Sequence, residues 1–366
     1  MRSASPASRV RSWHVWLLVW RTHRWIAFGF GALLVLMSAT GSLLVVHHEL
    51  EALLEADRHR VAPTASPDQP LADIVRGAAA EAPADFRPFR LMPAAEPGAT
   101  HKLLLLGPDQ KTRWAVFVEP ASGRILWSGP DQSLFTPWLL HLHMHLQLGR
   151  GGYYLTGLAG VALTLLALTG LYIHRDRLAT LWRHPFRLAL GWRVALADLH
   201  SWIGIVTLYF PLMLGVTGTL YVLVSLDQPA AKPAAVTFSA AQLPALEPLR
   251  DAARQRFPGA EVLRLQFPAE AQGAITVLLL HRTNPPWQKF SRVEFTAATG
   301  ELRRVRAADE ASAGEQFRAM LAPLHFGFYG ATWVKWAYFF GGLAPLALAV
   351  SGTALWWVRT RGARIR

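Results

Sequence analysis

The chain of 366 residues contains no cysteine. This absence excludes thiolate-bound iron–sulfur clusters, heme attached through a CxxCH motif, and redox disulfides. The sequence also lacks a GxGxxG fingerprint after a strand and a Walker A motif, so it shows neither a dinucleotide-binding domain nor an ATP-driven pump. Any redox centre must therefore be held by histidine or another non-thiolate ligand, and its electrons must come from an external donor.

Acidic residues are scarce, since 24 Asp and Glu stand against 37 Lys and Arg, for a formal net charge of +13. The most prominent features that remain are four apolar segments at 25–46, 153–173, 202–224 and 333–358. Each is about 20 residues or longer, which is enough to cross a hydrocarbon core. We predict four transmembrane helices. The first segment is too long for a cleaved signal peptide and lacks a small-residue cleavage site.

Three arginine-rich stretches flank these segments, at the N-terminus, between the second and third segments, and at the C-terminus. They contain Arg2, Arg9, Arg11, Arg21 and Arg24, then Arg175, Arg177, Arg183, Arg187 and Arg193, then Arg359, Arg361, Arg364 and Arg366. The positive-inside rule places all three stretches, and so both termini, in the cytoplasm. Because the basic residues follow the membrane flanks, we expect a lipid bilayer as partner and no nucleic acid.

Two long polar segments, 49–138 and 225–322, fall on the outer side of this topology. Each is expected to form an α+β domain with a helix (71–82 and 246–257), a strand (102–106 and 275–281) and a hairpin (114–127 and 291–303). Gly123 and Gly300 stand where a tight hairpin turn needs positive φ. The predicted order is the N-terminus and first span (1–48), first outer domain (49–138), second span (139–174), cytoplasmic loop (175–198), third span (199–224), second outer domain (225–322), fourth span (323–358) and cytoplasmic tail (359–366).

The spans also repeat. The sequence His-Arg-Trp-Ile at His23 matches His-Ser-Trp-Ile at His200, and in both copies a Thr-Gly pair begins 17 residues after the histidine. Leu-His pairs that end at His143 and His325 are each followed by Thr-Gly or Ser-Gly, which begins 26 residues after the histidine. The fold class that follows is a membrane α-helical protein with four transmembrane helices in two span–domain–span repeats. Such repeats imply pseudo-symmetric packing and paired sites.

Histidines stand at the ends of the apolar segments, where burial without a partner is costly. Neutral imidazole is a good ligand for heme iron. We therefore expect the repeat-matched pair His23 and His200 to ligate heme near the cytoplasmic side, with His174 as a rival ligand. The alternative is that these side chains reach the headgroup region as interfacial residues. His184 lies in the short basic loop and is expected to be solvated.

On the outer side, His143 and His325 form the second repeat-matched pair. The sequence Leu-His-Leu-His-Met-His around His143 is open to two interpretations. An extended chain would put His141, His143 and His145 on one face as a zinc or copper site. A helix, which we prefer because the segment leads into a span, would let His141 and His145 share a face and turn His143 elsewhere. His145 is the second-ranked ligand, and His47 and His48 could substitute. A purely structural role for the cluster also stays open.

The combination of His-x-Trp-Ile, Thr-Gly, an outer hairpin that ends in Ala-Ser-Gly or Ala-Thr-Gly, Leu-His and a final Trp-Trp resembles the PepSY-associated transmembrane-helix family. The resemblance runs from His23 to Arg359. That family includes iron-regulated inner-membrane proteins and siderophore ferric reductases. The resemblance implies PepSY-like periplasmic domains, bound heme b, and electron transfer to ferric siderophores.

We therefore expect an inner-membrane b-type cytochrome with two hemes that passes electrons from a quinol or a cytoplasmic reductase to a ferric siderophore. The candidate ligands are His23, His200, His143, His325, His174 and His145. Outer residues such as Trp287, Lys289 and Arg292 are candidates to meet the siderophore. The alternative is a non-redox transporter or assembly protein whose outer domains bind peptide or a partner.

Overall fold

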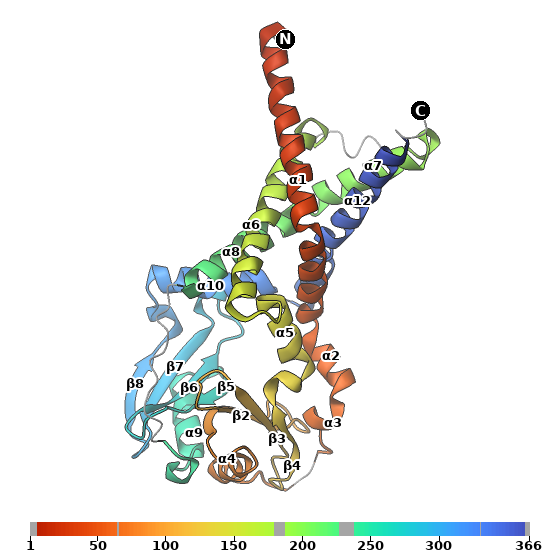
Figure 1. The fold of residues 1–366 in the computed structure, drawn as a ribbon. Coiled ribbons are helices and arrows are strands. Elements are labelled where there is room, and N and C mark those ends of the chain that lie inside the picture. The colour runs from red at the N-terminus through yellow and green to blue at the C-terminus, as the bar shows by residue number, and fades with distance from the viewer. Residues whose placement is uncertain (1–5, 64–65, 179–186, 227–237, 330, 363–366) are drawn as a thin grey trace. The chain divides into compact units, whose positions relative to one another are not determined.

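The computed structural model describes residues 6–63, 66–178, 187–226, 238–329 and 331–362 (Figure 1). His184 and the arginines at positions 2, 183, 364 and 366 lie outside the described residues. The chain divides into two compact units. The helical unit comprises Met1–Val46, Leu139–Gln228 and Leu321–Arg366, and the sheet unit comprises His47–Trp138 and Pro229–Met320.

The helical unit contains long apolar helices. They are α1 (Pro6–Val45), α6 (Gly149–His174), α7 (Trp192–Val206), α8 (Tyr209–Leu226), α11 (Thr332–Gly342) and α12 (Ala344–Gly362), together with the ends of α5 (Phe135–His145) and α10 (Ala313–Phe326). Three stretches, Trp13–Val45, Gly149–His174 and Thr332–Val358, are long and apolar enough to cross a membrane. Most of their residues are not buried within the chain, which suits helices surrounded by lipid.

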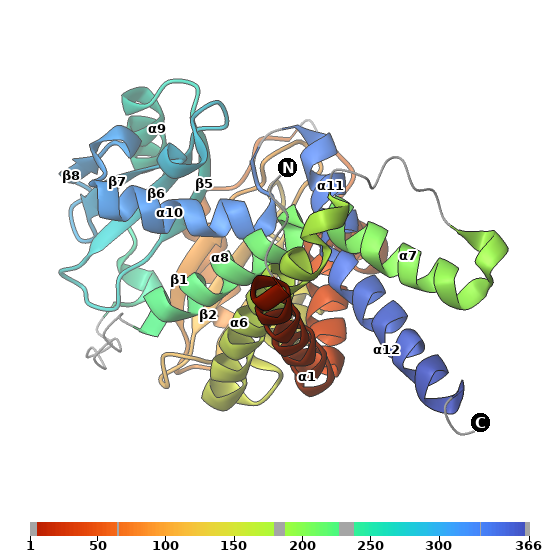
Figure 2. The same cartoon turned by 90° about the horizontal axis from the view of Figure 1, so that it is seen from above.

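The third predicted span is not one straight helix. Helices α7 and α8 meet at a bend of 58° (Figure 2), and together they are apolar enough to form either a broken fourth span or a re-entrant loop. The break follows from Pro211, which has no N–H to donate and whose ring clashes with the carbonyl four residues earlier. That carbonyl belongs to Thr207, the residue that ends α7.

The sheet unit is built on one antiparallel sheet of eight strands in the order β4-β3-β2-β1-β5-β6-β7-β8. The strands are β1 (Arg87–Met92), β2 (His101–Leu106), β3 (Arg113–Val118), β4 (Ile125–Pro130), β5 (Glu261–Gln266), β6 (Ala274–Leu280), β7 (Phe290–Thr296) and β8 (Leu302–Arg306). The two polar segments, which the sequence analysis treats as separate domains, are thus halves of one sheet. Strands β1 and β5 join them, with Arg90 opposite Gln266 and Leu91 opposite Leu265.

One face of this sheet carries the core. Helices α4 (Leu71–Ala80) and α9 (Glu247–Arg256) lie on the same face (Figure 1) and bury Val75 and Ala253 against it. The sheet supplies an alternating set of buried residues to this core, among them Leu91, Leu265 and Val277. Burial on every second residue is expected where a strand packs on this face. The opposite face of β2 and β3 carries a second, smaller buried cluster, formed by Leu104, Ala115, Phe117 and Leu134.

The two predicted hairpins are confirmed. Strand β3 pairs with β4, and β7 pairs with β8. Gly123 has φ +71° and Gly300 has φ +73°, the left-handed backbone that glycine adopts without steric cost. The predicted helices at 71–82 and 246–257 correspond to α4 and α9. Short segments α2 (His47–Leu54) and α3 (Ala56–His59) precede the first half of the sheet.

Candidate cofactor site

Four histidines in the helical unit each have a ring nitrogen beside a hydroxyl group from another helix. The Nδ1 to oxygen distances are 2.9 Å for His23 and Thr169, 2.9 Å for His143 and Thr40, 2.8 Å for His200 and Ser351, and 3.0 Å for His325 and Thr217. The hydroxyls come from the Thr-Gly and Ser-Gly pairs noted in the sequence. Within each repeat the two spans exchange partners, so the histidine of one meets the hydroxyl of the other.

The direction of these hydrogen bonds follows from a second contact that each hydroxyl makes. Each oxygen donates to the backbone carbonyl four residues earlier in its own helix. The distances are 2.7 Å from Thr40 to Leu36, 2.6 Å from Thr169 to Leu165, 2.7 Å from Thr217 to Met213, and 2.7 Å from Ser351 to Ala347. A hydroxyl has one proton, so with that proton engaged it accepts from Nδ1–H. The tautomer that results leaves a lone pair on Nε2 of each histidine.

The glycine after each hydroxyl residue makes room for the imidazole. A Cβ atom on Gly41 would lie 2.9 Å from Cε1 of His143, and one on Gly218 would lie 3.0 Å from Cε1 of His325. The corresponding distances are 3.5 Å for Gly170 with the ring of His23 and 3.3 Å for Gly352 with the ring of His200. Each Thr-Gly or Ser-Gly pair therefore has two roles. Its hydroxyl orients the imidazole ring, and its glycine, which has no side chain, leaves space for that ring.

His143 and His325 come together as a pair across the two repeats. Their ring centroids lie 6.5 Å apart, with 48° between the ring planes. Two imidazole nitrogens that share one metal ion at about 2 Å each place their ring centroids about 6 Å apart. The spacing of the His143–His325 pair therefore suits one metal ion between the rings.

A second group contains His23, His174 and His200. His200 lies within electrostatic range of both His23 and His174, and His23 within range of His174. His23 and His200 are the repeat equivalents and have the same hydroxyl support. His174 ends α6.

His145 belongs to a different group. Its ring stacks on His141 at 4.9 Å and on Tyr153 at 5.1 Å, and its Nδ1 lies 3.3 Å from the carbonyl oxygen of Gly149. The segment is helical in α5, so the preferred helix interpretation is confirmed and the extended three-histidine metal site is wrong. His143 lies on another face of α5 because residues two apart on a helix point about 200° apart.

His47 and His48 form a group of their own at the start of α2 in the sheet unit. Their ring centroids are 4.0 Å apart, and their ligand atoms and those of Glu51 all lie within 4.8 Å of one another. Burial opposes ionisation of the Glu51 carboxyl, but the His48 and Thr136 side chains outweigh it and lower its pKa to about 2. The group is thus an anionic carboxylate beside two imidazoles.

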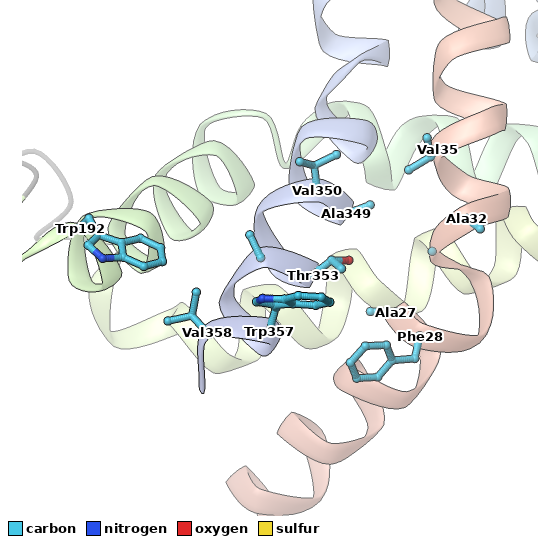
Figure 3. A pocket seen from close by; sticks show the side chains of 12 residues that line it. Ala27, Phe28, Ala32, Val35, Trp192, Ala349, Val350, Thr353, Trp357 and Val358 are labelled. Carbon is cyan, nitrogen blue, oxygen red and sulfur yellow. The ribbon is translucent and has the colours of Figure 1, made fainter. Parts of the chain in front are cut away.

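An open groove of about 780 Å³ runs between α1, α7 and α12 (Figure 3). Its walls combine small residues such as Ala27, Gly31 and Ala349 with the aromatic rings of Phe28, Trp192 and Trp357. A Cβ on Gly31 would meet no atom within 4 Å, so the space beside it is open. This volume lies within the range of small-molecule and cofactor sites. Ser351, which supports His200, stands next to the groove residue Val350 in α12.

Comparison with known proteins identifies the family of this chain. A stretch of 255 residues is 32% identical to a protein of Pseudomonas aeruginosa named "Uncharacterized protein PA4219", and it covers 62% of this chain and 64% of that relative. The chain thus spans less than two thirds of the relative's length. The family described as the PepSY-associated TM region matches residues 20–359, which is nearly the whole chain. This protein is therefore a membrane protein that belongs to the family of PepSY-associated transmembrane regions.

Proposed function

We propose that this chain is an inner-membrane heme b protein that passes electrons across the membrane to ferric siderophores in the periplasm. The observation that carries the proposal is the set of four histidines whose Nδ1–H groups are each held by a hydroxyl. This arrangement leaves an Nε2 lone pair on each of the four histidines. Equivalent positions in the two repeats pair His143 with His325 and His23 with His200.

The residues fit heme better than an isolated metal ion. A structural zinc ion takes four protein ligands, whereas the His143–His325 pair offers two imidazoles 6.5 Å apart. Two imidazoles would suffice as the protein ligands of a low-spin heme iron, and small residues leave open space beside α1. His143 and His325 would hold the outer heme. His23 and His200 would hold the inner one, with His174 as the rival ligand. Heme supplies an iron that gains and loses one electron without leaving the protein.

The chain's own residues hold the imidazoles in one tautomer and keep the sites apart from water. Hydroxyl support fixes the ring orientation of each ligand before any cofactor binds. The Trp13–Val45 and Gly149–His174 helices provide an apolar surround that limits solvent access. Limiting solvent access influences the reduction potential of a bound metal.

Reduction would release iron from a siderophore because its hard oxygen ligands hold Fe(III) far more tightly than Fe(II). One electron converts Fe(III) to Fe(II), the weaker Fe(II) complex dissociates, and the freed ligand oxygens take up protons from water. The electron would come from a membrane quinol or a cytoplasmic reductase. The arginine-rich stretches favour cytoplasmic termini and a periplasmic sheet unit.

Absorption spectroscopy of the purified full-length protein tests the heme. We expect a b-type, low-spin spectrum from bis-imidazole ligation. His143→Ala and His325→Ala should each lose part of the absorbance. His141→Ala should retain it, because His141 lies in the stack with His145. A colourless wild-type protein would favour the non-redox transporter or assembly protein. Full absorbance in both alanine variants would remove these two residues from the ligand set.

The activity is tested on the heme-loaded protein in detergent. Dithionite-reduced protein, freed of excess reductant, should be reoxidised by a ferric siderophore, and Fe(II) should appear in a ferrous chelator. If the protein stays reduced with hydroxamate and catecholate siderophores alike but is oxidised by quinone, a respiratory or assembly role would replace the reductase assignment.

A further inference from the structure

Four arginines from four strands form a continuous row on the sheet face opposite α4 and α9. They are Arg113 on β3, Arg90 on β1, Arg264 on β5 and Arg292 on β7, and we name this row the arginine face. Residues paired across antiparallel strands share a face, as do residues two apart on one strand.

The register links these positions from one half of the sheet to the other. Arg264 and Arg292 both pair with Leu278, so they stand on either side of it. Arg90 pairs with Gln266, which is two residues from Arg264. Arg90 also pairs with Leu104, which pairs with Ala115, two residues from Arg113. The arginine face therefore exists only because β1 and β5 join the two halves into one sheet.

A carboxylate does stand on the same face, since Glu294 lies two residues along β7 from Arg292 and opposite Arg304, but it forms no ion pair with the arginine face among the described residues. Some other basic residues of the sheet unit do form ion pairs, namely Lys102 with Asp131, Arg282 with Glu261 and Arg306 with Glu315. None of the four arginines of the arginine face has an ion-pair partner among the described residues. The Nε atoms of Arg90 and Arg264 are buried and have no hydrogen-bond partner there.

The arginines of this face instead repel one another. Burial, followed by the charges of Arg264 and Arg113, lowers the pKa of Arg90 to about 10. Burial, followed by the charge of Arg292, lowers the pKa of Arg264. Both pKa shifts mean that burial and the neighbouring charges make the cationic form less stable here than in water, although both guanidinium groups stay cationic at neutral pH. An anion placed on the row would reverse that effect by supplying the missing partners.

We propose that the arginine face binds the anionic oxygen groups of the ferric chelate, so that the substrates are catecholate, phenolate or carboxylate siderophores. The iron in this assignment rests on the proposed reductase function. Guanidinium groups present planar pairs of N–H donors that match carboxylate and phenolate oxygens. A negatively charged chelate meets these donors along the row, whereas an uncharged trihydroxamate chelate offers no net charge to the four cations.

Binding of redox-inert gallium(III) chelates tests this without any electron transfer. The full-length protein in neutral detergent is titrated with a triply anionic Ga(III) tris-catecholate and with an uncharged Ga(III) trihydroxamate. We expect the anionic chelate to bind more tightly, with an affinity that falls as salt is added. Arg292→Gln and Arg264→Gln should each weaken it by about tenfold or more. The matched control is Arg282→Gln, because Arg282 is exposed and paired with Glu261.

Three results would overturn the proposal. Equal affinity for the two chelates would show that charge does not decide binding. Unchanged catecholate affinity in Arg292→Gln, which alters an exposed and therefore tolerant position, would show that the row is not the site. If Arg292→Gln weakens binding to phosphatidylglycerol vesicles but leaves chelate affinity intact, the row is instead a lipid contact. A colourless protein that still binds the gallium catecholate would reject the heme assignment alone.

Discussion

Replacement of Thr217 by valine is the most direct test of how the histidines are held. Thr217 accepts the Nδ1–H of His325 at 3.0 Å and donates its own proton to the Met213 carbonyl at 2.7 Å. Valine keeps the shape of the side chain but has no hydroxyl, so Nδ1–H of His325 loses its acceptor. The ring can then rotate or change its tautomer, and both changes weaken Nε2 as an iron ligand.

The magnitude follows from two independent scales. A buried donor left without a partner costs about 1 to 3 kcal/mol. Loss of the group that orients a metal-ligating histidine costs about 10- to 100-fold in affinity, which is about 1.4 to 2.8 kcal/mol. The two ranges agree, so we expect Thr217→Val to weaken heme binding by one to two orders of magnitude.

The assay is the transfer of heme from the protein to excess apomyoglobin, followed by absorbance. Thr217→Val should release heme faster than wild type, and Thr217→Ser should restore wild-type retention because Ser351 performs this role for His200. The control is Thr207→Val, since the Thr207 hydroxyl donates to the Ile203 carbonyl and meets no imidazole. Equal heme release from the Thr217→Val and Thr207→Val variants would refute the reasoning.

Three further outcomes test other parts of the structure. Gly41→Ala should lower heme content, because its Cβ would lie 2.9 Å from the His143 ring; Gly29→Ala in the same helix meets no atom within 4 Å and should be neutral or stabilising by up to about 1 kcal/mol. A phosphatase that is active only in the periplasm should show no activity when it is fused after Arg366, because the C-terminus is expected in the cytoplasm. Activity of this fusion would reverse the proposed topology. The pKa of Glu51 is lowered to about 2 in the folded protein, so its carboxylate stabilises the fold at pH above 4.5, and this contribution is lost as the pH falls from 4.5 towards 2. The difference in thermal stability between wild type and Glu51→Gln should therefore shrink over that pH range. A difference that stays constant would contradict an ionised, stabilising Glu51.

Local patterns predicted much of the fold. Glycines at positions 123 and 300 marked both hairpins, and the apolar spacing marked α4 and α9. The pairing of β1 with β5, which joins the two halves of the sheet, could not be predicted from such local patterns. Strands β1 and β5 contain arginine, glutamate or glutamine among their apolar residues, so they look like ordinary polar connections. Their pairing joins residues about 175 positions apart, and no short-range signal reports such a contact. The bend of the third span did have a signal in Pro211.

Sequence reasoning singled out the residues of the candidate site but not the contacts between them. Repeat spacing singled out His23, His143, His200 and His325, along with the Thr-Gly and Ser-Gly pairs. It did not show that each histidine meets the hydroxyl of the other span, because a repeat compares equivalent positions and says nothing of which ones touch. The structure places the His145 ring against His141 and Tyr153 and on a different face of α5 from His143, and its role as a ligand stays a prediction.

The proposed ligand pairs would each require both repeats. Each histidine–hydroxyl contact lies within one repeat, whereas the His143–His325 pair takes one ring from each. The repeats meet where α6 packs on α8, and a Cβ on Gly160 would lie 3.0 Å from the Gly215 carbonyl oxygen. Small residues permit this close approach between helices. A single repeat could therefore orient its histidines and still supply only one histidine of each proposed ligand pair, so the proposed heme sites would require the packing of one repeat against the other.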